Sequence, residues 1–241
     1  MTTYVYAITR PGTAAPDLEG VGGPVRVLAW EQLAAVVSDV DVDGELPATA
    51  RVLKAHARVL EALATQATVL PLRFGTVVDD DAAVVEQVLR PRAEALAALL
   101  DRFTGLVEVD VRVLDEDEVL LREVVSGDAA VQALQRKVAR VGPTAGYYDR
   151  IRLGEHVAER LRQRHAREVD DVVAALRPLA VDVKVKEPSL QGLVVDAALL
   201  VERDRLAEVD AAVDAVARKR QDLTVRYLGP NPPYSFTVGE V

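Results

Sequence analysis

The sequence lacks cysteine entirely, which excludes disulfide bonds, thiolate metal sites and cysteine nucleophiles. Aromatic residues make up only 4% of the 241 residues, and Asp and Glu outnumber Lys and Arg by 38 to 29. The resulting formal net charge of −9 makes the chain a poor general binder of nucleic acid, because contacts to phosphate require Lys and Arg. A locally basic surface remains compatible with this composition.

Long apolar runs are also missing. The longest stretch without Asp, Glu, Lys or Arg covers 13 residues, 227–239, and three prolines interrupt it. A membrane-spanning helix, in contrast, needs about 20 predominantly apolar residues. The N-terminal residues do not show a basic region followed by an apolar core, which is the pattern of a secretory signal. We therefore expect a cytoplasmic protein.

The remaining composition is that of a globular protein, with 50% hydrophobic and 28% charged residues. Apolar periodicity and turn residues predict strands at 4–8, 25–30, 33–37, 68–78, 105–114, 179–186, 193–202 and 223–228, and helices at 49–65, 79–103, 115–126, 128–140, 145–176 and 204–220. This order predicts an α+β fold, in which the helices of the first domain lie on one side of an antiparallel sheet.

The same patterns divide the chain into three parts. We expect a first domain over residues 1–125, a second domain over 126–226, and a tail over 227–241 that is rich in proline and aromatic residues. In the strand at 105–114, valines alternate with Glu108, Asp110 and Arg112, which predicts one face open to water. In the helix at 145–176, an apolar stripe with steps of three or four residues begins at Tyr147 and ends at Leu176.

Known catalytic and nucleotide-binding motifs are absent from the sequence. The histidines are His56, His156 and His165, and the last two lie nine residues apart on one predicted helix, on nearly opposite faces. The pattern Asp39-x-Asp41-x-Asp43-Gly44 resembles the start of a calcium loop, but Ala50 stands where such a loop needs Glu. We therefore expect no enzyme, no cofactor and no metal site. The alternative is an enzyme in which His56 or His156 meets an Asp or Glu.

A run of arginines leaves another alternative open. Six arginines lie between Arg150 and Arg167 on the predicted long helix, together with only two glutamates, Glu155 and Glu159. A charge run of this kind is a solvated helix face by default. It could also dock an acidic protein partner or bind nucleic acid, although no aromatic residues alternate with these arginines.

The start of the tail has an unusual composition. Residues 227–236 hold three prolines and three of the ten aromatic residues of the chain. A proline-rich segment is already extended, so it loses little conformational entropy when it docks. We expect this segment either to pack on the protein's own core as a strap or to be recognised by a partner.

Three segments of the chain form a pattern: Y-V-Y-A-I at 4–8, V-L-P-L-R-F-G-T at 69–76, and Y-L-G-P-N-P-P-Y-S-F at 227–236. In this order, and over nearly the whole chain, they resemble the gas vesicle protein F/L family (GvpF/GvpL). Tyr147-Tyr148 looks like the tyrosine-containing motif of that family, here preceded by Gly-Pro-Thr-Ala-Gly instead of Gly-Arg-Glu. Asn231 stands where the family commonly has Trp.

The resemblance implies a fold and a function. It implies an N-terminal ferredoxin-like α/β sandwich and a C-terminal α+β domain with a long helix and antiparallel strands, with the tail packing back on the first domain. It also implies a non-enzymatic accessory or minor structural protein, associated with gas vesicles, that binds the hydrophobic shell protein and assists vesicle nucleation or assembly. The alternative is a nucleic-acid-binding or enzymatic protein with a ferredoxin-like fold.

The resemblance also implies partners and site residues. The partners would be the major gas vesicle shell protein and other gas vesicle accessory proteins, with no nucleic acid and no membrane span. The residues expected to matter for partner binding or for structure are Leu72, Arg73, Phe74, Tyr227, Pro232, Pro233, Tyr234 and Phe236.

Overall fold

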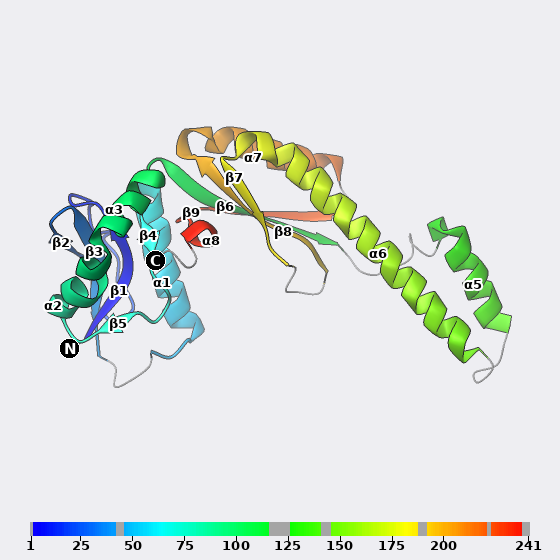
Figure 1. Ribbon diagram of the computed structural model, residues 1–241, viewed down its shortest axis with the longest axis horizontal. Helices are drawn as coiled ribbons and strands as arrows, with labels where there is room; N and C mark the ends of the chain where they lie inside the picture. Colours follow the sequence, from blue (N-terminus) through cyan, green and yellow to red (C-terminus); the bar gives the residue numbers. More distant parts are fainter. Residues whose placement is uncertain are drawn as a thin grey trace. The chain divides into compact units, whose positions relative to one another are not determined.

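The computed structural model describes residues 2–41, 46–115, 126–140, 146–187, 192–220 and 223–237 (Figure 1). The chain forms two compact units, and each unit combines segments that are distant in sequence. The first unit comprises Met1–Val109, Leu199–Leu206 and Leu228–Val241, and the second comprises Asp110–Ala198 and Ala207–Tyr227. The helix expected at 115–126 falls mostly on residues 116–125, which lie outside the described residues.

The first unit is built on a five-stranded antiparallel sheet with β1 (Thr2–Thr9) at its centre. Along one edge of β1 lies β3 (Leu33–Val40), which forms a hairpin with β2 (Arg26–Trp30). Along the other edge lie two short strands, β4 (Leu70–Pro71) and β5 (Val77–Val78). The three strands predicted before residue 40 are thus confirmed.

Helices cover both faces of this sheet. Side chains alternate between the two faces of a strand, yet every residue of Thr3–Thr9 and of Leu33–Ser38 is buried. The helix α1 (Ala50–Gln66) packs on the face that carries Tyr4 and Tyr6. Figure 1 shows α3 (Ala93–Arg102) on the other side of β1, and α3 contacts β3 and β4. The expectation of helices on one side only is therefore wrong. A strand with one wet face alternates apolar and polar residues, whereas a strand that is covered on both faces is apolar along its length, as β1 and β3 largely are.

The helix predicted over 79–103 is present but irregular. It consists of α2 (Asp81–Ala83), the π-helical turn η1 (Val84–Leu89), the 3-10 turn η2 (Arg90–Arg92) and α3. Asp80 caps its start, since the Asp80 carboxylate accepts a hydrogen bond of 2.8 Å from the Ala83 amide. The irregular turns surround Pro91, which has no amide hydrogen to donate within the helix.

The strand predicted over 68–78 is present only as two short pieces, β4 and β5, along the edge of β1. Both pieces pair antiparallel with β1 and run in the same direction along its edge. Residues 72–76 between them stand opposite only Val5 and Tyr6 and bulge out in a tight turn, in which the Thr76 amide donates to the Arg73 carbonyl at 3.2 Å. Gly75 has a φ of +86°, a left-handed conformation that glycine adopts without steric cost. The alternating apolar pattern of this segment fits one continuous strand, but the turn that contains Gly75 interrupts it.

A second sheet has four strands in the order β7-β8-β6-β9. The strands are β6 (Leu106–Asp115), β7 (Asp182–Val185), β8 (Leu193–Glu202) and β9 (Leu223–Asn231). The helices α5 (Ala129–Arg140) and α6 (Tyr147–Leu176) lie between β6 and β7 in the chain, and α7 (Leu206–Lys219) lies between β8 and β9. The two antiparallel sheets and the long helix α6 confirm the α+β class.

The apolar stripe predicted along α6 is buried only near the C-terminal end of the helix. Val172 and Leu176 are buried, whereas Tyr147 and Ile151 are exposed. The helix α5 packs beside the first half of α6, where Lys137 of α5 forms an ion pair of 2.9 Å with Asp149. A regular 3.6-residue stripe therefore predicts the helix correctly but not the burial of its whole length.

Candidate functional site

His56, on the sheet-facing side of α1, joins segments from three distant parts of the chain. Its Nδ1 lies 2.8 Å from the phenol oxygen of Tyr4 in β1. Its Nε2 lies 3.0 Å from the phenol oxygen of Tyr234, in the short helix α8 (Tyr234–Thr237). The ring of Phe74 packs edge-on at a centroid distance of 5.5 Å. The three segments that carry the family pattern therefore meet at one imidazole.

The environment of His56 keeps its ring neutral at pH 7. The residue is 6% exposed, and burial lowers the pKa of His56 to about 4. A neutral imidazole has one donor and one acceptor nitrogen, so one tyrosine hydroxyl donates to it and the other accepts from it. The enzymatic alternative requires a carboxylate on this histidine, whereas tyrosine hydroxyls occupy both of its nitrogens.

Two tyrosines of β1 complete the aromatic cluster around His56. The Tyr6 ring stacks on the imidazole at 5.7 Å, and the Tyr4 and Tyr6 rings meet edge-to-face at 4.7 Å. The Tyr6 hydroxyl lies 2.9 Å from Ser38 Oγ, and the Tyr4 hydroxyl accepts a hydrogen bond of 3.3 Å from the Gly75 amide. Burial raises the pKa of Tyr4 to about 12, so this hydroxyl remains protonated. These bonds fix the turn at Gly75 against β1.

Glu108 anchors the tail on the first unit. The Ser235 amide donates to one carboxylate oxygen of Glu108 at 2.7 Å, and the Ser235 hydroxyl donates to the other at 2.6 Å. Glu108 is 2% exposed, so the prediction that it faces water is wrong. The alternation in β6 is correct, but the tail satisfies the carboxylate with two hydrogen bonds, as a buried polar group requires.

The residues predicted to matter fall into two groups. The buried ones are Leu72, Pro232, Pro233 and Phe236. The Leu72 amide also donates to the Tyr6 carbonyl at 2.9 Å, and α8 contacts β4. The surface ones are Arg73, which is exposed, Phe74, which is half-buried, and Tyr234, which is 37% exposed. Segment 72–74 and the tail are thus adjacent in the first unit.

Tyr227 is the exception among the predicted residues. It belongs to the second unit, where it is half-buried and its hydroxyl is hydrogen-bonded to Asp210 of α7. Burial and the Asp210 carboxylate both raise the pKa of Tyr227. Its contacts are those of a structural residue in the middle of β9.

Sequence reasoning did not select His56, Glu108 or Ser235 as site residues. A usable signal was present for His56, because it lies on the same helix face as Val59 and Leu63, and a buried polar side chain needs partners. The partners themselves come from positions 52 residues earlier and 178 residues later in the chain. No local pattern identifies partners at such separations.

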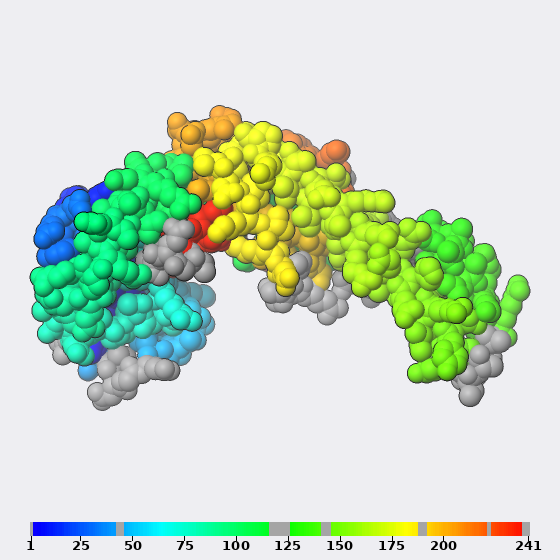
Figure 2. All heavy atoms as spheres, viewed as in Figure 1, coloured from blue at the N-terminus to red at the C-terminus, as the bar shows by residue number. Residues whose placement is uncertain are grey.

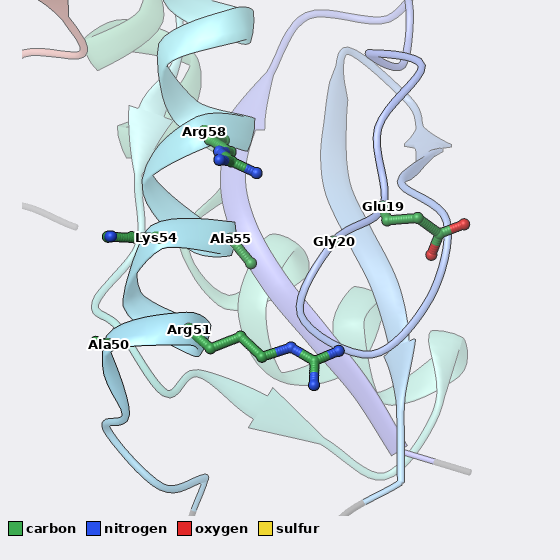
Figure 3. Close-up of a pocket in the computed structure, with 7 residues that line it drawn as sticks. All are labelled: Glu19, Gly20, Ala50, Arg51, Lys54, Ala55 and Arg58. Carbon is green, nitrogen blue, oxygen red and sulfur yellow. The ribbon is translucent and has the colours of Figure 1, made fainter.

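A separate basic groove lies between α1 and the loop that carries Glu19 (Figure 3). It has a volume of about 510 Å³, and its cationic lining residues are Arg51, Lys54 and Arg58 of α1. Figure 3 shows Arg51 and Arg58 extending from the helix toward the loop. Within the described residues, none of these three cations forms an ion pair. The groove can receive an acidic group, but apart from two alanines and one glycine its lining is charged.

Metal-ligand clusters and membrane-spanning helices are both absent from the described residues. Among them, no group of three or more Asp, Glu, His or Cys side chains is placed to hold a metal ion. Asp39, from the calcium-loop pattern, forms a 2.7 Å hydrogen bond with Arg26, while Asp43 and Gly44 lie outside the described residues. In the same ranges, every helix is too short or too polar to cross a bilayer.

Comparison with known proteins identifies the family. The model of the family described as gas vesicle synthesis protein GvpL/GvpF matches residues 2–238. The chain belongs to the GvpL/GvpF family. Gas vesicle protein F of Streptomyces sp. (strain CB03234) is 35% identical, over 98% of this chain and 99% of its own length. Gas vesicle protein L of the same strain is 30% identical, over 97% of this chain and 91% of its own length.

The fold is also that of a GvpL/GvpF protein. The crystal structure of the gas vesicle protein GvpF from Anabaena sp. PCC7120 is similar with a TM-score of 0.85 at 24% identity. The match covers 98% of this chain and 97% of the other. Proteins of this family are non-enzymatic structural or assembly proteins of gas vesicles. The resemblance drawn from the three segments is therefore confirmed.

Proposed function

We propose that this GvpL/GvpF protein associates with gas vesicles, binds their hydrophobic shell protein and assists vesicle nucleation or assembly, together with other accessory proteins. The family match over residues 2–238 is the observation that carries this proposal. Physically, the protein would cover the apolar face of the shell subunit before polymerisation, because an exposed apolar surface aggregates. Binding of this kind requires a rigid surface and no catalytic groups.

The surface that suits this role is formed by Arg73, Phe74 and Tyr234, here named the junction surface. Two hydrogen bonds from Thr76 to the Arg73 carbonyl, at 3.2 and 2.6 Å, hold the turn that presents Arg73 and Phe74. The bond to His56 holds Tyr234. Aromatic residues and arginine are enriched at protein interfaces, and fixing them before binding lowers the entropy cost of association.

The buried members of the predicted set have a structural role in this proposal. Leu72 and the tail residues Pro232, Pro233 and Phe236 are buried, and the tail helix α8 contacts β4. Replacing them by Ala should lower stability, and binding should fall only as far as the folded fraction falls. The tail is therefore a strap that presents Tyr234, and not a free peptide ligand.

We assign the ferredoxin-like arrangement to the second sheet instead of the N-terminal domain. The elements β6-α6-β7-β8-α7-β9 follow the β-α-β-β-α-β order of that fold, with α5 as an addition, and the strand order is β9-β6-β8-β7. The first unit does not follow this order, because three strands precede α1. The C-terminal half of the chain then supplies the ferredoxin-like part, while the first unit presents the junction surface.

The test is a pull-down of the major shell protein by the purified full-length protein, with duplex DNA as a parallel probe. We expect the wild type to retain the shell protein and not the DNA. The double variant R73A/F74A should retain less shell protein than the wild type by a factor of about five or more. The matched control is R51A/L53A, which removes an exposed arginine and an exposed leucine from α1 of the same unit. If R73A/F74A retains as much shell protein as the control, the junction surface is not the binding site. If the wild type retains no shell protein, the proposed function is contradicted.

A further inference from the structure

The helices α5 and α6 form a hairpin that buries little of its own apolar surface. The hairpin is defined here as Asp128–Arg140 and Gly146–Arg167. Within it, Val131 is the buried hydrophobic residue of α5, and the buried residues of α6 begin only at Glu168. Figures 1 and 2 show α5 beside the N-terminal half of α6. Two helices alone cannot cover both sides of α6, so one side of the N-terminal half of that helix has no cover from the described residues of the second unit.

The uncovered side of α6 carries apolar residues with helical spacing. Tyr147 is 60% exposed, Tyr148 78% and Ile151 42%, and the stripe continues through the exposed residues Gly154 and Ala158. Steps of three and four residues place this stripe along one face of the helix. The Tyr147 and Tyr148 rings contact each other edge-to-face at 5.5 Å. A partner helix can therefore lie along this face, with the two tyrosines at one end.

Arginines border this apolar face on both sides. At 100° per residue, Tyr147, Ile151 and Tyr148 span one arc at the start of the helix, and Arg150 and Arg152 lie just beyond its two edges. Glu155 falls inside the same arc one turn after Ile151. An apolar centre with a charged rim is the composition of a protein interface, and exposed Tyr and Arg are the residue types that dominate binding energy there. The rim is basic, so it fits a partner that carries carboxylates at its own rim.

The charge of the whole hairpin supports an acidic partner. Residues 128–167 contain nine Lys and Arg against four Asp and Glu, although the chain as a whole has a net charge of −9. Three of the four acidic residues are already used inside the hairpin, in the pairs Asp128–Arg160, Asp149–Lys137 and Glu159–Arg162. In the described part of the chain, no ion pair engages five of the arginines, which are Arg136, Arg140, Arg150, Arg152 and Arg167.

This charge also argues against other occupants. Two copies of the hairpin would form a four-helix arrangement, but the excess of five positive charges on each would make them repel. The basic groove on α1 offers charge without exposed aromatic residues in its lining. The hairpin combines positive charge and exposed aromatic residues on one helix face. An amphipathic protein helix complements both properties, whereas a phosphate chain complements only the charge.

We propose that this face of the hairpin is a second docking surface, and that its occupant is an acidic amphipathic helix of the shell protein. The proposal rests on the proposed function, since it names where that same partner docks. The partner helix lies along the stripe from Tyr147 to Ala158, and its carboxylates pair with Arg150 and Arg152. Because the pairs are at the rim, binding through this face weakens as salt rises.

The experiment measures how much shell protein is retained by full-length variants during co-expression and pull-down. The charge variant is R150E/R152E, and the apolar variant is Y147S/Y148S, which changes only exposed side chains. The matched control is R51E/R58E in the groove of the first unit, which changes the net charge by the same amount. Circular dichroism confirms that each variant keeps its helices. The junction variant R73A/F74A is measured in parallel. Duplex DNA tests for nucleic-acid binding, and sedimentation of the protein alone tests for self-association.

We expect R150E/R152E and Y147S/Y148S each to retain about ten-fold less shell protein than the wild type, and R51E/R58E to match the wild type. Wild-type retention should also fall between about 50 and 500 mM NaCl. If the wild type binds but the hairpin variants bind equally well, this docking surface is wrong and the proposed function stands. Absence of wild-type binding overturns both. Hairpin variants that lose only DNA binding or only self-association show a different occupant and overturn the proposal.

Discussion

The phenol oxygen of Tyr234 lies 3.0 Å from Nε2 of His56, although 178 residues separate the two in the chain. On the other side of the same ring, Nδ1 lies 2.8 Å from the hydroxyl of Tyr4. One neutral imidazole therefore ties the last described helix to the first strand. Since Gly75 also bonds to Tyr4, the turn that presents Arg73 and Phe74 depends on the same network.

The first prediction concerns the pH dependence of the first unit. Burial lowers the pKa of His56 from 6.5 to about 4, so the unfolded state binds a proton between these values and the folded state does not. Stability should therefore fall as the pH drops from about 6.5 to about 4, by up to about 3 kcal/mol from this residue. Urea unfolding followed by the fluorescence of Trp30, the only tryptophan, measures this loss.

The control for this prediction is His56→Phe, which keeps a ring but cannot bind a proton. We expect this variant to be less stable than the wild type at pH 7, because it leaves two tyrosine hydroxyls without their partner. Its stability should also change less between pH 6.5 and 4. Parallel pH curves for the two proteins would show that His56 is not the titrating group.

The second prediction concerns the buried carboxylate of Glu108. Replacing Glu108 by Ala removes both acceptors of Ser235 and should lower stability by about 2–3 kcal/mol, while Ser235→Ala removes only the hydroxyl bond and should cost about 1 kcal/mol. Amide hydrogen exchange in α8 should increase more in the Glu108 variant, since the tail loses its anchor. Equal exchange in the two variants would mean that other contacts hold the tail.

The third prediction compares two glycines that have free space around them. A Cβ at Gly75 or at Gly154 would have no atom within 4 Å, so only the backbone decides the effect of Ala. Gly75 has a φ of +86°, and Gly75→Ala should destabilise the first unit by about 1–2 kcal/mol. Gly154 lies inside α6, where Gly154→Ala should stabilise the helix by up to about 1 kcal/mol. Thermal unfolding followed by circular dichroism checks both, and the same sign for both would contradict the account.

Local patterns predicted most elements but not the contacts between them. The helices α1 and α6 and the strands β1, β3 and β6 follow from apolar periodicity, which depends on neighbours a few residues away. The turn at Gly75 was missed because its segment also alternates like a strand. The outward position predicted for Glu108 was wrong because its cover comes from Ser235, 127 residues later.

The candidate site shows the same limit. The segments around Phe74 and Tyr234 were selected from the sequence, yet the residue that joins them, His56, was considered there only for the enzymatic alternative. It is buried, but its two partners are supplied by tertiary packing, which no spacing within the sequence encodes. For α6, the periodicity marks an apolar stripe, and only the structure shows that its first half is exposed.

The most direct measurement of the central claim follows the aggregation of the shell protein itself. Light scattering is recorded when denatured shell protein is diluted into buffer with increasing amounts of the full-length protein, and with R73A/F74A in parallel. We expect the wild type to suppress scattering in proportion to its amount and the variant to suppress it much less. Scattering that is unchanged by the wild type, relative to the same mass of serum albumin, would contradict the account.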